Sequence, residues 1–205
     1  MNWGKLFLTC LGLTLFSYQT YAQMISKQGL LQYQSDFVQA QKKIDSRLAD
    51  TANNTPVSIE LSLQKAQLYM AFQRADLLQS LLSDIQQQIM TQDDVVIQSQ
   101  WHFLSGVQLY LVGKYAQASE SFKSSSLLLE EVNSQQEYAY LENFILMYQA
   151  VNRIYLQQYE VALDELTTVF KRAEKNNWPI IQASSLVFIG DVSYALKNHE
   201  QALEY

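Results

Sequence analysis

Cysteine, glycine and proline are scarce in this chain, whose 205 residues include one Cys, six Gly and two Pro. A β-rich protein of this size needs many more turn residues, so the scarcity favours helices joined by short loops. The single cysteine, Cys10, excludes an intrachain disulfide framework. Because Cys10 lies in a segment that we expect to be cleaved, thiol catalysis by the mature chain is excluded as well.

Clustered basic residues and long apolar runs are also missing. The formal net charge is -6 and no run of Lys and Arg occurs, which argues against nucleic acid as a partner. After residue 22, no uninterrupted apolar stretch approaches the roughly 20 residues that a membrane-spanning helix needs. Hydrophobic residues still make up 48% of the chain, which is enough for a folded core and excludes general disorder.

Residues 1–22 have the pattern of a secretory signal segment. A positively charged start precedes an apolar stretch over 6–16, and small residues precede the expected cleavage after Ala22. Cleavage makes Gln23 the first residue of a mature chain that is secreted across the inner membrane, which predicts a periplasmic location. The alternatives are an uncleaved anchor and a lipoprotein modified at Cys10, although a lipoprotein needs a longer apolar segment ahead of the cysteine.

An internal repeat organises the rest of the chain. The segment from Gly113 to Ala118, followed by Phe122, has related segments before and after it, spaced by 40, 44 and 40 residues. Its equivalent positions are Leu78, Ala118, Ala162 and Ala202. Twelve residues before each of them stands a small residue, in the order Ala66, Gly106, Ala150 and Gly190. Such a period predicts stacked helical hairpins, in which a small residue lets two helices approach closely.

Helices are expected near residues 26–49, 57–72, 76–90, 95–112, 116–131, 136–156, 160–175, 180–196 and from 199 onward. Pro56 and Pro179 suit first helical positions, and the short loops make neighbouring helices antiparallel. Helical spacing selects the core residues of two hairpins, Leu104, Leu111, Phe122, Leu127 and Leu128 in one and Leu141, Ile145, Tyr148, Ile154, Leu163, Leu166 and Val169 in the next.

The spacing of small and aromatic residues resembles the tetratricopeptide repeat (TPR). The residues that carry the resemblance are Gly106, Gly113, Tyr115, Ala118 and Phe122 in one copy and Gly190, His199 and Ala202 in another. The period of 40 to 44 residues is longer than the usual period of about 34. Gln157 replaces the turn glycine of the third copy, and His199 replaces the turn tyrosine of the fourth.

This resemblance implies an all-α fold, a right-handed superhelical α-solenoid of antiparallel helix pairs over residues 56–205. An N-terminal capping helix region is expected over 23–55. The resemblance also implies a protein or peptide partner, bound along a concave face that the first helix of each pair lines. The candidate groove residues are Phe103, Val107, Tyr110, Met147, Val151, Tyr155, Asp191 and Tyr194. The alternative is that the next repeat buries most of them, because apolar stripes at helical spacing usually form the core.

The sequence stops three residues after Ala202, whereas the second helix of the earlier copies continues for about a dozen. We therefore expect a fragment of a longer protein, with a natural stop and a frayed end as the alternative. A signal segment before long repeats is similar to the input region of some bacterial membrane-bound diguanylate cyclases. That similarity implies, as a second hypothesis, a sensor region with a membrane-anchored GGDEF output domain downstream.

No catalytic pattern is found in the sequence. The two histidines, His102 and His199, are far apart, and no HxxxH, CxxC or ExxH pattern offers a zinc site. Phosphate-loop, dinucleotide-binding and Gly-x-Ser-x-Gly motifs are absent. The acidic pairs 93–94 and 130–131 suit a helix start and a solvated face better than catalysis. We therefore expect no intrinsic enzyme activity, no metal and no cofactor, and a hydrolase with a cryptic site is the third hypothesis.

Overall fold

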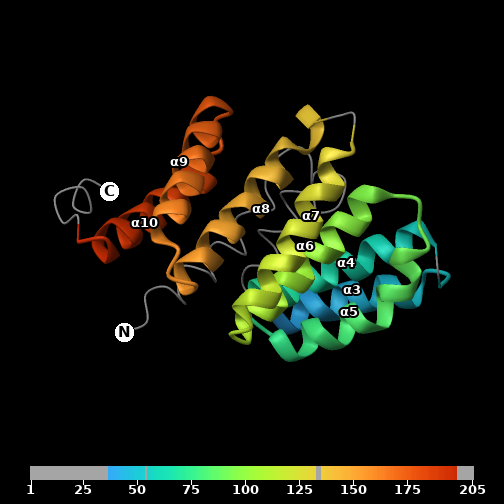
Figure 1. The fold of residues 1–205 in the computed structure, drawn as a ribbon. Helices are drawn as coiled ribbons and strands as arrows, with labels where there is room; N and C mark the ends of the chain where they lie inside the picture. Colours follow the sequence, from blue (N-terminus) through green and yellow to red (C-terminus); the bar gives the residue numbers. More distant parts are fainter. Residues whose placement is uncertain (1–36, 54, 133–134, 198–205) are drawn as a thin grey trace.

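The structure, a computed structural model, describes residues 37–53, 55–132 and 135–197, and all regular structure in these ranges is helical (Figure 1). The helices are α3 (Phe37–Ala49), α4 (Pro56–Ala71), α5 (Ala75–Met90), α6 (Val95–Leu111), α7 (Tyr115–Glu130), α8 (Gln135–Tyr155), α9 (Tyr159–Lys175) and α10 (Pro179–Ala195). The all-α prediction is confirmed for these residues. The seven helices from α4 to α10 begin and end within one residue of the predicted bounds.

Neighbouring helices pack against each other in chain order, as Figure 1 shows. Three successive pairs are α4 with α5, α6 with α7, and α8 with α9, and α10 packs on α9. The first helices of successive pairs also contact one another: α4 packs on α6, α6 packs on α8, and α8 packs on α10. The array is therefore compatible with a solenoid-like helical repeat, in which α6 and α8 each have helices on both sides.

The repeat is present in the backbone of the turns. The first helix of each pair is followed by a residue with left-handed φ, namely Gln73 (55°), Gly113 (78°), Gln157 (59°) and Lys197 (62°). Their spacing of 40, 44 and 40 residues is the spacing of the sequence repeat. After Tyr155, the N–H of Gln157 donates to the carbonyl of Ile154 (3.0 Å), and the N–H of Gln158 donates to that of Arg153 (3.0 Å). This pair of bonds satisfies the last carbonyls of the helix, as a left-handed helix end requires.

Capping residues fix where three of the helices begin. Thr55 accepts a hydrogen bond from the N–H of Ser58, whose hydroxyl in turn accepts from the N–H of Thr55, so α4 begins with a capping box. Asp94 accepts from the N–H groups of the second and third residues of α6. Pro56 and Pro179 stand in the first turns of α4 and α10. The predicted helix starts at these residues are confirmed.

One hydrophobic core runs through α4 to α10, and a smaller cluster of Ala40, Ile44 and Leu68 joins α3 to α4. The predicted core residues are buried or half-buried with one exception, Leu127, which is 50% exposed. The buried stripe of α7 consists of Ala118, Phe122, Ser125 and Leu129. Leu127 is two residues from both Ser125 and Leu129, which places it on the opposite side of α7 from this stripe, so its assignment to the core was wrong.

The column of small residues lies where the two helices of a pair meet. Ala66 and Ala150 are buried, and a Cβ added to Gly106 would lie 2.6 Å from two ring atoms of Phe122. Gly190 is half-buried. On the second helices, the equivalent column of Leu78, Ala118 and Ala162 is fully buried. The predicted signal segment 1–22, the start of the region 23–55, and the residues His199 and Ala202 lie outside the described residues.

Candidate functional site

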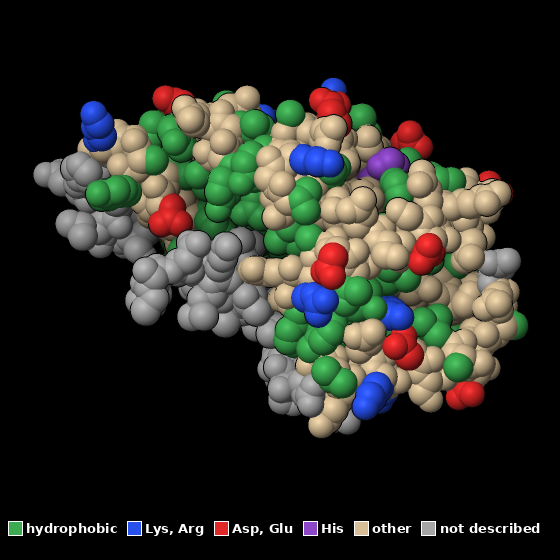
Figure 2. Space-filling model, turned by 90° about the horizontal axis from the view of Figure 1, so that it is seen from below, with side chains coloured by type: hydrophobic (Ala, Val, Ile, Leu, Met, Phe, Trp, Pro, Cys, Tyr) green, Lys and Arg blue, Asp and Glu red, His purple; other side chains and the backbone are tan. Residues whose placement is uncertain are grey.

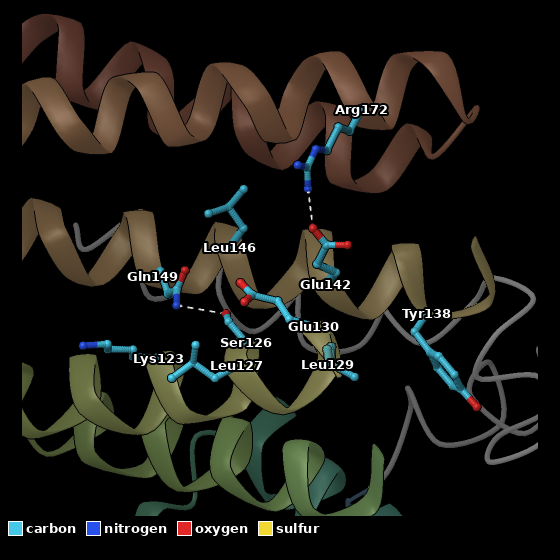
Figure 3. A pocket seen from close by; sticks show the side chains of 10 residues that line it. All are labelled: Lys123, Ser126, Leu127, Leu129, Glu130, Tyr138, Glu142, Leu146, Gln149 and Arg172. Atoms are coloured by element: carbon cyan, nitrogen blue, oxygen red, sulfur yellow. Dashed lines mark hydrogen bonds and ion pairs between the residues drawn. The ribbon is translucent and has the colours of Figure 1, made fainter. Parts of the chain in front are cut away.

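A groove lies over α8 between α7 and α9, with a cavity volume of about 330 Å³ (Figure 3). We call it the α8 groove. Its lining residues are Lys123, Ser126, Leu127, Leu129, Glu130, Tyr138, Glu142, Leu146, Gln149 and Arg172. The lining side chains of α8 recur every three or four residues, which places them on one face of the helix. From residue 140 to residue 148, every residue of α8 is buried except Glu142 and Leu146, which line the groove and are half-buried.

Polar contacts hold the two walls of the groove to its floor (Figure 3). The Arg172 guanidinium of α9 reaches Glu142 on α8, with 2.7 Å between Nη1 and Oε1. On the opposite wall, the Gln149 side-chain amide of α8 donates to the Ser126 hydroxyl of α7 at 3.1 Å. The Arg172–Glu142 pair is about half exposed on both sides (47% and 45%), so solvent weakens it and a ligand can replace it at low cost.

The centre of the groove is apolar. Figure 3 shows Leu127 of α7 and Leu146 of α8 between Lys123 at one end and Tyr138 at the other. Leu146 and Tyr138 are half-buried, and Leu129 of α7 is buried. Fully burying a leucine side chain contributes about 1.5–3 kcal/mol, so covering the exposed half of Leu127 would contribute about 1 kcal/mol.

The equivalent positions of the preceding pair are polar, which distinguishes the α8 groove from the corresponding face over α6. Leu127 has Gln87 of α5 and Lys171 of α9 as its counterparts, and both are exposed. The counterparts of Leu146 and Tyr138 on α6 are His102 and Asp94. Exposed leucine on an otherwise polar outer face is the signal that sequence reasoning overlooked. Aligning the three second helices by their repeat period would have revealed it.

Two charged residues at the groove are without an ion-pair partner among the residues that the structure describes. Lys123 and Glu130 are exposed on α7 and lie on the same side of that helix as Leu127. With Glu142 and Arg172 the groove carries two positive and two negative side chains. The groove as a whole is therefore neutral.

The eight groove residues expected from the family resemblance fall into two sets. Five of them are buried members of the main core, namely Phe103, Val107, Tyr110, Met147 and Val151. They pack inside the array and are not a surface that a peptide can reach, so for them the alternative of core packing holds. The other three, Tyr155, Asp191 and Tyr194, are exposed. None of the eight lines the α8 groove.

Tyr155 belongs to a cluster of three tyrosines that lies beside the α6–α7 turn. Its ring stacks on Tyr115 with centroids 4.8 Å apart, and the ring of Tyr110 meets it edge-on at 5.4 Å. Burial, reinforced by a hydrogen bond with Tyr155, raises the pKa of Tyr110 far above its usual range. Tyr110 is therefore a neutral phenol at any physiological pH, which favours a packing role over proton transfer.

Other titratable groups are dispersed. Partial burial raises the pKa of Asp191 and lowers the pKa of His102, and neither group has a charged partner as a cause of its shift. Among the described residues, no three His, Cys, Asp or Glu side chains come close enough to hold a metal ion. Figure 2 shows one face of the molecule, on which acidic and basic side chains are scattered and hydrophobic side chains gather near its middle.

Comparison with family models and with curated proteins found no match for this chain. Within residues 37–53, 55–132 and 135–197, no helix combines the length and the apolar character that crossing a membrane requires. The site is therefore interpreted from its own geometry.

Proposed function

We propose that this chain is a secreted, TPR-like module that binds polypeptides through the α8 groove and has no catalysis of its own. In this proposal the helix pairs stack as a right-handed superhelix, and the partner lies across α7, α8 and α9. The observation that carries the proposal is the apolar groove centre at Leu127 and Leu146, where the preceding copy of the repeat has the polar residues Gln87 and His102.

The lining suits a polypeptide better than a small molecule. A leucine-like side chain of the partner would cover Leu127 and Leu146, and an aromatic ring at one end, Tyr138, offers further contact area. The amide of Gln149 and the hydroxyl of Ser126 lie beside this apolar centre and can pair with partner backbone groups. An open groove with one apolar anchor site and polar flanks is the anatomy of a moderate-affinity protein interface.

The test is a peptide selection followed by affinity measurement. Peptides are selected from a random displayed library against the purified chain, and their affinities are measured by fluorescence anisotropy. Leu127→Gln gives α7 the residue that α5 has at this position and keeps helix propensity. We expect it to lower the affinity of the selected peptides about fivefold, because the roughly 1 kcal/mol gained when a peptide covers Leu127 is lost.

The matched control is Val161→Gln, which changes an exposed apolar residue of α9 (47% exposed) outside the groove lining. It should leave the affinities unchanged. Peptides that bind Leu127→Gln as tightly as the wild-type chain would overturn the assignment of the groove, and a selection that enriches no peptide would overturn the binding function.

Secretion is the second part of the proposal, and it rests on the sequence of residues 1–22. Expressed in a Gram-negative host, the chain should appear in the periplasmic fraction with Gln23 as its first residue. N-terminal sequencing of the purified protein measures this. A full-length chain that stays in the cytoplasmic fraction would contradict it.

A further inference from the structure

Two side chains of opposite charge flank the apolar centre of the α8 groove along α7. Lys123 lies four residues before Leu127 and Glu130 lies three residues after it, which corresponds to about 6 and 4.5 Å along the helix axis. Figure 3 shows the same order, with Leu127 between Lys123 and Glu130. Both charged side chains are exposed. A ligand side chain that covers Leu127 therefore has a positive group on one side of it and a negative group on the other.

The remaining charges of the groove already satisfy each other. The Arg172 guanidinium holds the Glu142 carboxylate at 2.7 Å, across the floor of the groove from α9 to α8. Neither Lys123 nor Glu130 has an ion-pair partner among the residues that the structure describes. These two side chains of α7 are therefore the charges that a ligand in the groove can pair with, without displacing an existing contact.

The two charges and the apolar centre distinguish this groove from the preceding copy of the repeat together. The counterparts of Lys123 and Glu130 on α5 are Ser83 and Met90, and neither of these is charged. The two leucines of the groove centre likewise replace polar residues of the preceding pair. A charged, an apolar and an oppositely charged position thus occur side by side over α8, whereas the backbone repeat requires none of the three.

We propose that the polypeptide bound in the α8 groove is an extended segment with an apolar residue, flanked two positions away by an acidic residue on one side and a basic residue on the other. This inference rests on the proposed function of the groove and names the class of its partner. An extended chain rises about 3.3 Å per residue and turns alternate side chains to the same face. The three side chains therefore reach Lys123, Leu127 and Glu130 from one face of the segment.

In such a complex the apolar contact and the ion pairs have different roles. Covering Leu127 supplies affinity, because apolar surface leaves the solvent. The ion pairs lie at an exposed rim, where solvent screens them, so they contribute little affinity of their own. They select the partner instead, because a segment with two acidic or two basic flanks places like charges together at one end. This selection should weaken as salt is added.

The experiment uses a displayed library of peptides with a fixed central leucine, in which the positions two residues before and two residues after it are each Asp, Gln or Lys. The purified chain should enrich peptides with one Asp and one Lys, in either order, because an extended segment can run in either direction along the groove. By fluorescence anisotropy at low salt, these peptides should bind about fivefold more tightly than peptides with two Asp or two Lys.

Charge reversal of the chain should change which peptides are enriched. Glu130→Lys makes both flanking charges positive and should shift the enrichment to peptides with two Asp, and Lys123→Glu should shift it to peptides with two Lys. The matched control is Glu131→Lys, the same change at an exposed neighbour outside the groove lining, which should keep the wild-type enrichment. Circular dichroism confirms that each variant folds.

An enrichment that Glu130→Lys or Lys123→Glu leaves unchanged would overturn the inference, as would the same shift with Glu131→Lys, because the net charge of the chain would then select the peptide. A wild-type enrichment without preference for unlike charges also overturns it. If Leu127→Gln still lowers peptide affinity in these cases, the groove keeps its binding function and only the class of partner is different. If Leu127→Gln has no effect, or if no peptide is enriched, the proposed function fails as well.

Discussion

The pairs α6–α7 and α8–α9 have the same backbone arrangement, offset by 44 residues, and fill it with different side chains. Gly106 lies against the ring of Phe122 in the first pair, and the equivalent positions of the second pair hold Ala150 and Leu166. One pair combines the smallest residue with a large one, and the other combines two residues closer in size. The space between the helices is therefore set by the two residues together, not by either position alone.

A second difference is polar. Near the start of the pair α6–α7, the hydroxyls of Ser99 and Ser125 each donate to the backbone carbonyl of the other residue, both at 2.8 Å. The equivalent positions in α8–α9 are Asn143 and Val169, where the Asn143 side-chain amide donates to the Val169 carbonyl at 3.1 Å. Asn143 leaves its own Oδ1 buried without a partner among the described residues. The same contact is thus fully satisfied in one pair and partly satisfied in the other.

The largest loss of stability should come from giving the pair α6–α7 the residue that the pair α8–α9 has at the helix contact. Gly106→Ala gives α6 the residue of α8, but its Cβ would lie 2.6 Å from Phe122, whose ring is held between Phe103 and Tyr148. We expect a loss of about 1–3 kcal/mol in the free energy of unfolding, measured by urea denaturation.

Adding Phe122→Leu to Gly106→Ala reproduces the side-chain pair of α8–α9 and should recover part of this loss, although Phe122→Leu alone destabilises the chain. The quantity to compare is the coupling energy of the double-mutant cycle. Additive free energies would show that the two pairs do not use interchangeable packing.

Removing the polar contact between the two helices should cost more stability in the pair α6–α7 than in the pair α8–α9. Ser99→Ala with Ser125→Ala removes two satisfied hydrogen bonds and should cost about 1–2 kcal/mol in the free energy of unfolding. Asn143→Leu, a change of similar volume, removes one bond together with a buried acceptor that has no partner, so it should change stability by less than about 1 kcal/mol. Thermal or urea unfolding measures both, and an equal loss in both variants would contradict the contrast.

The sequence predicts the repeated part of this molecule and not the part that differs between copies. The sequence reveals the positions of Gly106, Ala150 and the turn before Tyr115, because the same packing requirement recurs every 40 or 44 residues. Close approach of two helices needs a small residue, and the left-handed residue of the turn recurs at the period of the repeat. Helix bounds were therefore predictable to within one residue for α4 to α10.

The candidate site was not predictable in the same way. Tyr110 and Val151 have the apolar character of groove residues, but they are buried because α6 and α8 are enclosed by helices on more than one side. Sequence spacing places a residue on a face of its helix and does not say how many neighbours cover that face. The error at Leu127 is the opposite one: its apolar character suggested a core residue, although it lies two residues from Ser125 and Leu129 and so on the exposed side of α7.

The turns should give a smaller difference of predictable sign. Gly113 and Gln157 are equivalent and have φ of 78° and 59°, a region in which a side chain is unfavourable. Gln157→Gly should therefore stabilise the chain by about 0.5–1 kcal/mol, and Gly113→Gln should destabilise it by a similar amount. Urea denaturation of the two variants measures both, and two shifts of the same sign would contradict the equivalence of the turns.

The smallest effect concerns an ion pair that only α8–α9 contains. Arg153 Nε lies 3.0 and 2.9 Å from the two carboxylate oxygens of Glu165, and the equivalent residues of α6–α7 are Leu109 and Ser121. Burial raises the pKa of Glu165 above its ordinary value of 4.5, and the opposing influence of Arg153 does not cancel this. The folded chain therefore binds this proton more readily than the unfolded chain does.

Glu165 thus stabilises the fold below pH 4.5, and this contribution is lost as the pH rises through the raised pKa of the folded state. Glu165→Gln should remove that part of the pH dependence, so that its melting temperature falls less steeply than the wild-type value as the pH rises from 4.5. Thermal unfolding followed by circular dichroism at a series of pH values measures both slopes. Parallel profiles would mean that Arg153 compensates the buried carboxylate fully, and the pairs α6–α7 and α8–α9 would then respond alike to pH.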